Sequence, residues 1–352
     1  MNRLTLMKSN QAMAGESVQQ ELATTSDSRS SGRRQDALLC EMALPFRGVF
    51  YPLGYPVEII TNDHGVLRAA DDSFGHGSLM RAAATLQIRI GVTDQISWGR
   101  PPEPIRREFN HLYSLVADVH NQAILDLKTL VNFAWITREV VKDRLYFRYN
   151  FLEKVVYLLL GSSVVTDLHA ACVSKNGKGI LLCGDSGAGK STLAYACART
   201  GWTYTSDDTS YLINDSDAPR VIGHSHRVRF RPAAKELFPE LARFTMTPRL
   251  EGKPSIEVPI SDLPVPRAAT ETKVDFIVYL NRHLSASTKL LRLPDGTAVQ
   301  RTCRELYSAG EIREMHEKIL ERLSSIPTYE LQFCDLYQGV HALDLLTQSE
   351  IS

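Results

Sequence analysis

Apolar and polar residues alternate along several short stretches in the first half of the chain, and this pattern predicts strands. Residues 85–90 alternate strictly, and residues 57–61 lie between a proline and a turn-forming Asn-Asp-His-Gly segment. Further strands are predicted at 113–118, 123–127 and 132–136. With no chemical cluster evident in this part, we expect a small α+β accessory domain.

The second half alternates strands with helices, which predicts an α/β core. An apolar stripe predicts one helix over 138–160, and a Lys-Asn-Gly-Lys-Gly turn predicts a hairpin between two strands. The elements expected after that helix are strands at 167–173, 180–183, 202–205 and 273–280, and helices at 189–199, 311–323 and 336–346.

Residues 1–36 are rich in Ser, Gln, Thr and Arg and lack any periodicity, so we expect a disordered tail. The domain organisation predicted from the sequence is this tail, the N-terminal α+β domain at 37–136, and a catalytic domain at 137–352.

Lys plus Arg and Asp plus Glu number 40 each, so the formal net charge is zero. This balance argues against a protein that coats nucleic acid or an anionic membrane. The six cysteines form no CxxC pair, which argues against a structural metal. The start lacks a secretory signal, and the apolar stretch at 155–165 is too short and too interrupted to span a bilayer. We therefore expect a cytoplasmic protein with neither nucleic acid nor membrane as a partner.

The segment after the apolar strand 180–183 fits the phosphate-loop pattern, GxxxxGK[ST]. Its glycines let backbone N–H groups turn toward phosphate oxygens, and the next helix presents its positive end to the same anion. Lys190 would neutralise the β- and γ-phosphates, and the Ser191 hydroxyl would ligate Mg²⁺. The predicted ATP-binding residues are Gly184, Asp185, Ser186, Gly187, Ala188, Gly189, Lys190, Ser191 and Thr192.

Two adjacent carboxylates, Asp207 and Asp208, end the strand that follows the phosphate-loop helix. One could accept a proton from a substrate hydroxyl while the other holds Mg²⁺ with Ser191, since neighbouring strand residues point to opposite faces. Asp is also common where strands end, so spacing alone leaves a solvated turn open.

His169 precedes the loop on the leading strand of the hairpin, where a single histidine is usually structural. Together with Gly184–Ser191, Gly201 and the Asp pair, however, it resembles the catalytic domain of the HPr kinase/phosphorylase family over about 165–212. The resemblance implies a P-loop kinase core of the HPr kinase and phosphoenolpyruvate carboxykinase type. It also implies that Asp207 is the general base, His169 its helper, and Asp208 the metal-side carboxylate.

Two departures narrow what the resemblance implies. Thr192 stands where the family usually has Glu, and residues 223–232 replace the family's segment for phosphorolysis and the protein substrate. We therefore expect a divergent kinase without phosphorylase activity, and a target other than HPr. The family's hexamer also makes a homo-oligomer an expectation.

Arg227, Arg229 and Arg231 alternate, so in a strand they would share one face. Three such cations repel one another unless an anion is present, which suggests a phosphate or an acidic substrate. An exposed strand face explains the pattern equally well. Lys253 is a weaker candidate for a substrate-side loop.

The sequence thus predicts a kinase that uses ATP and Mg²⁺ to phosphorylate a serine-type hydroxyl of a protein, a peptide or a small molecule. Asp207, His169 and Lys190 are the predicted catalytic residues, and Ser191 and Asp208 the predicted metal ligands. The alternatives are a non-catalytic nucleotide-binding regulator, which would need no acid pair, and an ATPase or a carboxykinase relative.

Overall fold

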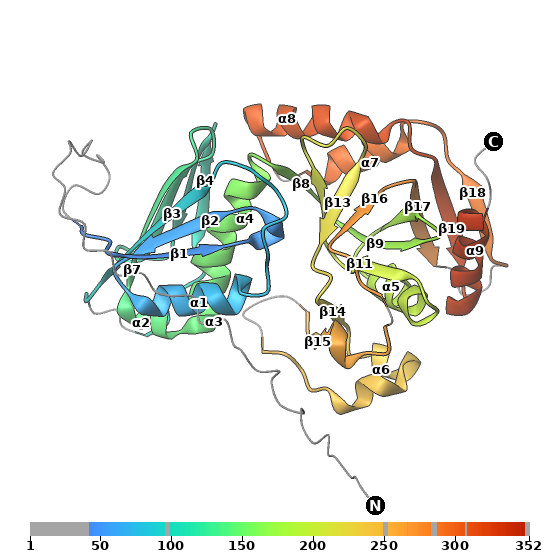
Figure 1. The fold of residues 1–352 in the computed structure, drawn as a ribbon, viewed down its shortest axis with the longest axis horizontal. Helices are drawn as coiled ribbons and strands as arrows, with labels where there is room; N and C mark the ends of the chain where they lie inside the picture. Colours follow the sequence, from blue (N-terminus) through green and yellow to red (C-terminus); the bar gives the residue numbers. More distant parts are fainter. Residues whose placement is uncertain are drawn as a thin grey trace, which may run out of the picture. The chain divides into compact units, whose positions relative to one another are not determined.

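In the computed structural model, residues 42–95, 99–248, 253–265, 267–282, 287–306 and 308–348 are described. The disordered tail predicted at 1–36 lies outside these ranges. Within them, strands alternate with helices in a mixed α/β arrangement (Figure 1).

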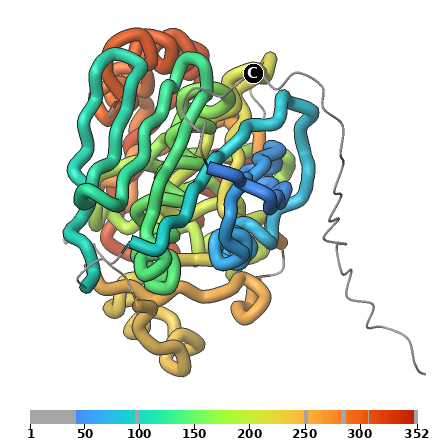
Figure 2. Tube along the Cα trace, turned by 90° about the vertical axis from the view of Figure 1, so that its left-hand side faces the viewer, coloured from blue at the N-terminus to red at the C-terminus, as the bar shows by residue number. Residues whose placement is uncertain are grey.

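The first sheet is mixed and has the strand order β1-β2-β3-β7-β6-β5-β4. Its strands are β1 (Phe46–Phe50), β2 (Val57–Thr61), β3 (Leu86–Thr93), β4 (Ile105–Phe109), β5 (Leu112–Val116), β6 (Gln122–Asp126) and β7 (Val131–Thr137). β3 pairs in parallel with β2 and β7, and the other pairs are antiparallel. Figure 2 shows the antiparallel strands β4 to β7 side by side in teal and green. The strands predicted from alternation in this region are confirmed.

The single helix predicted at 138–160 is wrong at Asp143, where a ψ of 76° interrupts the helix. The Asp143 carboxylate accepts a hydrogen bond from the Tyr146 N–H at 3.3 Å and so caps a new helix. The helices of this region are α1 (His64–Phe74), α2 (Arg138–Lys142), α3 (Arg144–Phe147), a π-helical turn (Arg148–Glu153) and α4 (Lys154–Gly161).

The segment 138–161 packs on the first sheet. Phe147, Phe151 and Leu159 are fully buried in one core with Ile59 and Leu115 of the sheet. The boundary predicted after residue 136 would therefore separate these helices from the strands they cover. Because residues 42–352 form one contact unit, the division into two domains stays a prediction.

The second sheet has the order β11-β9-β10-β17-β19-β18. Its strands are β9 (Ala170–Lys175), β10 (Lys178–Cys183), β11 (Thr203–Ser206), β17 (Phe276–Arg282), β18 (Lys289–Arg292) and β19 (Thr328–Phe333). β9 and β10 form the predicted hairpin, with Asn176 and Gly177 at positive φ in the turn. β9 is antiparallel to both β10 and β11. The carboxyl ends of β10 and β11 and the start of β9 therefore lie at one edge of the sheet.

The remaining strands of the described residues form two smaller sheets. One has the order β16-β13-β12-β8, and β14 pairs with β15 in the other. Their bounds are β8 (Val165–Leu168), β12 (Ser210–Ile213), β13 (Arg220–Gly223), β14 (Arg227–Phe230), β15 (Ile256–Pro259) and β16 (Glu271–Lys273).

Helices pack on both sides of the second sheet. Residues of α5 and α9 share a buried cluster with one face of β10, and residues of α7 and the end of α8 share a cluster with the other. β10 is thus buried on both faces, as its unbroken apolar run predicts. The helices are α5 (Lys190–Arg199), α6 (Ala234–Leu237), α7 (Thr297–Glu305), α8 (Gly310–Leu320) and α9 (Leu336–Gln348).

Two strands predicted as continuous are in fact divided between sheets. The chain bends at His169, where β8 pairs with β12 but β9 pairs with β10 and β11. The strand predicted at 273–280 is likewise divided between β16 and β17.

None of the helices in the described part of the chain combines the length and the hydropathy needed to cross a bilayer. The cellular location stays a prediction.

We expect Gly223→Ala to destabilise the protein by about 1–3 kcal/mol, because an added Cβ would lie 2.3 Å from the backbone oxygen of Thr205. Gly161→Ala is the matched control. It ends α4 with no atom within 4 Å of its added Cβ, so a gain of about 0.5–1 kcal/mol is expected. Urea unfolding measures both, and equal effects of the two substitutions would contradict the close approach of β13 to β11.

Candidate active site

The predicted phosphate loop connects β10 to α5 and has the backbone conformation that its glycines permit. Gly184, Gly187 and Gly189 have φ values of 141°, 97° and 100°. A Cβ on Gly187 or Gly189 would meet no atom within 4 Å, so glycine is needed there for the backbone angle and not for space. Gly189 is the cap residue that precedes α5, and it has no side chain to accept a hydrogen bond. The first N–H groups of α5 therefore have no partner from the cap residue.

Lys190 lies across this loop. Its ammonium group donates hydrogen bonds to the carbonyl oxygens of Gly184 at 2.6 Å and Asp185 at 3.4 Å. The residue is only 5% exposed, and this burial lowers the pKa of Lys190, while the nearby charge of Asp208 opposes the shift. The loop thus holds the Lys190 ammonium group among carbonyl oxygens. Phosphate oxygens could replace these carbonyl oxygens as its hydrogen-bond acceptors.

Asp207 follows β11 and is 8% exposed. One carboxylate oxygen accepts from the Tyr204 hydroxyl at 3.2 Å and the other from the Arg229 backbone N–H at 2.8 Å. Burial raises the pKa of Asp207 to about 6, even though the Arg229 N–H favours the charged form. A carboxylate with this pKa is suited to accept a proton near neutral pH.

Asp208 differs from its neighbour in both exposure and charge state. Its carboxylate lies 3.5 Å from His169 Nε2 and 3.4 Å from the Arg229 guanidinium. The hydrogen bond from His169, followed by the charge of Arg229, lowers the pKa of Asp208. The side chains of His169 and Asp208 are 41% and 45% exposed. At neutral pH the two aspartates therefore offer one buried carboxylate, whose pKa is about 6, and one accessible carboxylate, whose pKa is lowered and which stays charged.

The edge shared by β9, β10 and β11 brings these groups together. The Ser191 hydroxyl donates to the backbone oxygen of Asp207 at 3.1 Å and joins the start of α5 to the acid pair. His169 stands at the bend before β9 and contacts Asp208 from the same edge. Ser191, the acid pair and His169 thus form one chain of contacts, and the charge of Asp208 acts on the neighbouring Lys190.

Two of the three predicted arginines lie at the site, and both form ion pairs with a carboxylate of the protein. Arg227 and Arg229 share the half-buried face of β14, and both bind Glu257 of β15, at 3.3 and 3.0 Å. Glu257 supplies an anion from within the protein to the alternating arginines, where the sequence suggested a phosphate or an acidic substrate. Nothing in its local sequence signals this pairing. Arg231 follows the strand and is exposed, as is Lys253, and neither lines the cavity beside the acid pair.

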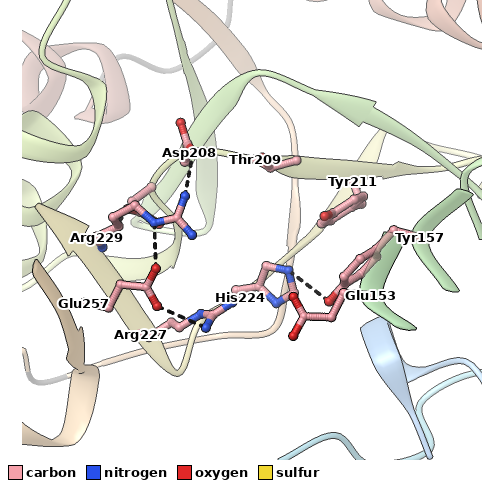
Figure 3. A pocket seen from close by; sticks show the side chains of 10 residues that line it. Glu153, Tyr157, Asp208, Thr209, Tyr211, His224, Arg227, Arg229 and Glu257 are labelled. Carbon is pink, nitrogen blue, oxygen red and sulfur yellow. Dashed lines mark hydrogen bonds and ion pairs between the residues drawn. The ribbon is translucent and has the colours of Figure 1, made fainter. Parts of the chain in front are cut away.

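A cavity of about 180 Å³ opens beside the acid pair (Figure 3). Several of its residues escaped the sequence analysis because they come from α4, β12 and the β13–β14 connection. Burial and the charge of Arg227 lower the pKa of His224 to about 3, so this imidazole is neutral. The lining residues are Glu153, Tyr157, Asp207, Asp208, Thr209, Tyr211, His224, Arg227, Arg229 and Glu257.

Ser191 and Asp208 are hard oxygen donors of the kind that Mg²⁺ prefers, and the lowered pKa keeps Asp208 ionised. Among the described residues, no group of three or more His, Cys, Asp or Glu side chains is arranged to hold a metal by itself. The two donors therefore fit an ion that shares its remaining ligands with phosphate oxygens and water, which is the usual mode for Mg²⁺.

Comparisons with known proteins do not identify a family for this chain. No protein-family model matches it, and no curated protein matches it either. Among solved structures, the HPr(Ser) kinase/phosphatase from Coxiella burnetii matches at 12% identity and a TM-score of 0.29, over 51% of this chain and 93% of that chain. This is a distant structural resemblance only.

Asp207→Asn should stabilise the protein at neutral pH, because it removes a buried charge and keeps the shape of the side chain. The difference between the ordinary pKa of 3.8 and about 6 corresponds to roughly 3 kcal/mol at most. A raised folded-state pKa means that stability is greatest below 3.8 and falls as the pH rises to about 6. The gain from the substitution should therefore vanish in acid, as urea unfolding at several pH values would show.

Asp208→Asn is the matched control. Because the pKa of Asp208 is lowered in the folded state, its carboxylate stabilises the protein at neutral pH, and the substitution should have the opposite sign. Two substitutions of the same sign at neutral pH would contradict the division of roles between the acids.

Proposed function

We propose that this protein is an ATP- and Mg²⁺-dependent kinase that transfers the γ-phosphoryl group to a serine-type hydroxyl. The observation that carries the proposal is the position of Asp207. Its backbone oxygen binds Ser191 of the phosphate loop, and its carboxylate, with a pKa of about 6, lines the cavity. In this proposal Asp207 is the proton acceptor, the loop that contains Ser191 would bind the polyphosphate, and the cavity would hold the hydroxyl substrate.

Each residue then has one task. The N–H groups of the loop and of the first turn of α5 would bind phosphate oxygens, and Lys190 would exchange its carbonyl partners for the same oxygens. Ser191 and Asp208 would hold Mg²⁺, and His169 would orient the Asp208 carboxylate through its hydrogen bond. ATP supplies the phosphoryl group, and Mg²⁺ neutralises its charge.

Asp207 would accept the hydroxyl proton of the substrate as the oxygen attacks phosphorus. Tyr204 and the Arg229 N–H hold its carboxylate in one orientation, so the base does not have to be ordered during the reaction. Positioning and charge neutralisation are the main demands of phosphoryl transfer, and these residues supply both.

Lys190→Ala should weaken ATP binding and lower turnover by orders of magnitude, because it removes the cation of the loop. Asp207→Asn should retain ATP binding and abolish transfer, because it removes only the proton acceptor. Binding of a fluorescent ATP analogue and transfer from radiolabelled ATP in cell extract measure the two separately. Lys318→Ala, an exposed change on α8, is the control. Full transfer by Asp207→Asn would show that another group is the base.

The transfer rate should rise about tenfold per pH unit below about 6 and then level off, because the base must be deprotonated. The measurement is the rate at saturating ATP between mildly acidic and neutral pH. A profile without an inflection in that range, on a protein shown to be folded throughout, would be inconsistent with Asp207 as the base.

A further inference from the structure

The lining of the cavity carries an excess of negative charge. Among the described residues, the lining contains four carboxyl residues, Glu153, Asp207, Asp208 and Glu257, against the two arginines of β14. Outside the lining, Arg148 forms an ion pair with Glu153, so the carboxylates still outnumber the cations. Of the described residues in that lining, the one histidine, His224, is neutral, because its pKa is lowered to about 3. An anionic acceptor would therefore enter against the charge of the wall.

The two arginines do not offer an open anion site. Both guanidinium groups bind Glu257, and that of Arg229 also contacts Asp208 (Figure 3). An acidic substrate would have to displace carboxylates that are fixed in place. This geometry opposes the acidic substrate that the alternating arginines alone suggested.

The end of the cavity formed by α4 combines aromatic rings with a carboxylate. Tyr157 and Tyr211 stack with centroids 5.8 Å apart, and His224 meets both edge-on at 5.9 and 5.7 Å. Glu153 lines the same cavity and is held through one oxygen by Ser73 at 2.8 Å and Arg148 at 3.0 Å. Aromatic rings beside a fixed carboxylate attract an ammonium group.

We infer that the acceptor is a small hydroxylated amine, whose hydroxyl faces Asp207 and whose ammonium group faces Glu153 and the tyrosine pair. The cavity volume of about 180 Å³ is below the roughly 300 Å³ at which drug-sized ligand pockets begin. The inference rests on the proposed kinase function and names its substrate class. It also gives α4, which packs on the first sheet, a role in acceptor selection.

Three serine derivatives that share one hydroxyl test the charge preference at about pH 6.5, below the α-amino pKa of about 8. At this pH L-serinamide is cationic, N-acetyl-L-serinamide is neutral, and N-acetyl-L-serine is anionic. The full-length protein is given Mg²⁺ and radiolabelled ATP with each compound, and with an end-blocked serine heptapeptide. We expect L-serinamide to be phosphorylated at least about tenfold faster than the others. Calorimetric binding with Mg²⁺ and a non-hydrolysable ATP analogue should give the same order.

Glu153→Gln should reduce the preference for L-serinamide over N-acetyl-L-serine at least severalfold while ATP binding is unchanged. Glu257→Gln should shift the preference in the same direction, because it frees Arg227 and Arg229 for an anion. Glu314→Gln, an exposed change on α8, is the matched control, and circular dichroism checks the folding of each variant.

The outcomes separate the inference from the function on which it rests. Transfer to N-acetyl-L-serine as fast as to L-serinamide, or transfer to the heptapeptide alone, would overturn the inference and leave the kinase function intact. ATP binding without transfer to any of the three derivatives would also overturn the small-amine acceptor. Failure to bind ATP at all would contradict the kinase function itself.

Discussion

The antiparallel strand β9 between β10 and β11 is the constraint on which the site depends. Because β9 runs against both neighbours, the phosphate loop after β10, the acid pair after β11 and His169 before β9 meet at one edge of the sheet. The hydrogen bond from Ser191 to the Asp207 backbone then joins the loop to the acids. Neither the turn nor the acid pair would form a site without this pairing.

The position of Asp207 is costly for folding and useful for chemistry. A buried carboxylate with a raised pKa destabilises the folded state at neutral pH, yet that pKa suits a general base. Two hydrogen-bond donors hold the carboxylate, so the cost is not relieved by movement into water. Asp208, one residue later, remains ionised beside His169 and Arg229. The two chemically identical side chains thus have pKa values shifted in opposite directions, because one is buried and the other is partly exposed beside His169 and Arg229.

The first half of the chain contributes to the site through α4. This helix belongs to the core of the first sheet, yet Tyr157 stacks on Tyr211 of β12 and reaches His224 across the cavity. Glu153, at the end of the preceding π-helical turn, lines the same space. The lining of the cavity is therefore built from segments on both sides of the predicted phosphate loop, whereas the loop itself is a single short segment.

Some features follow from the sequence alone because they are local. The strand–loop–helix at 180–199 is confirmed, since its three glycines permit positive φ within a few residues of one another. The Asn-Gly hairpin and the alternating strands of the first sheet are also confirmed, because turn residues and side-chain alternation are local features too. The helix expected at 138–160 was wrong because one side chain, Asp143, caps a new helix, and periodicity carries no sign of such a cap.

Only the tertiary structure decided what surrounds the acids. His169 reaches Asp208 because the chain changes sheets at the bend, which an apolar pattern cannot show. Glu257 pairs with two arginines about thirty residues away, and Tyr157 lines the cavity from a helix fifty residues before Asp207. Local sequence determines backbone angles and burial patterns. The charge and shape of a cavity depend on long-range pairings, which no segment encodes by itself.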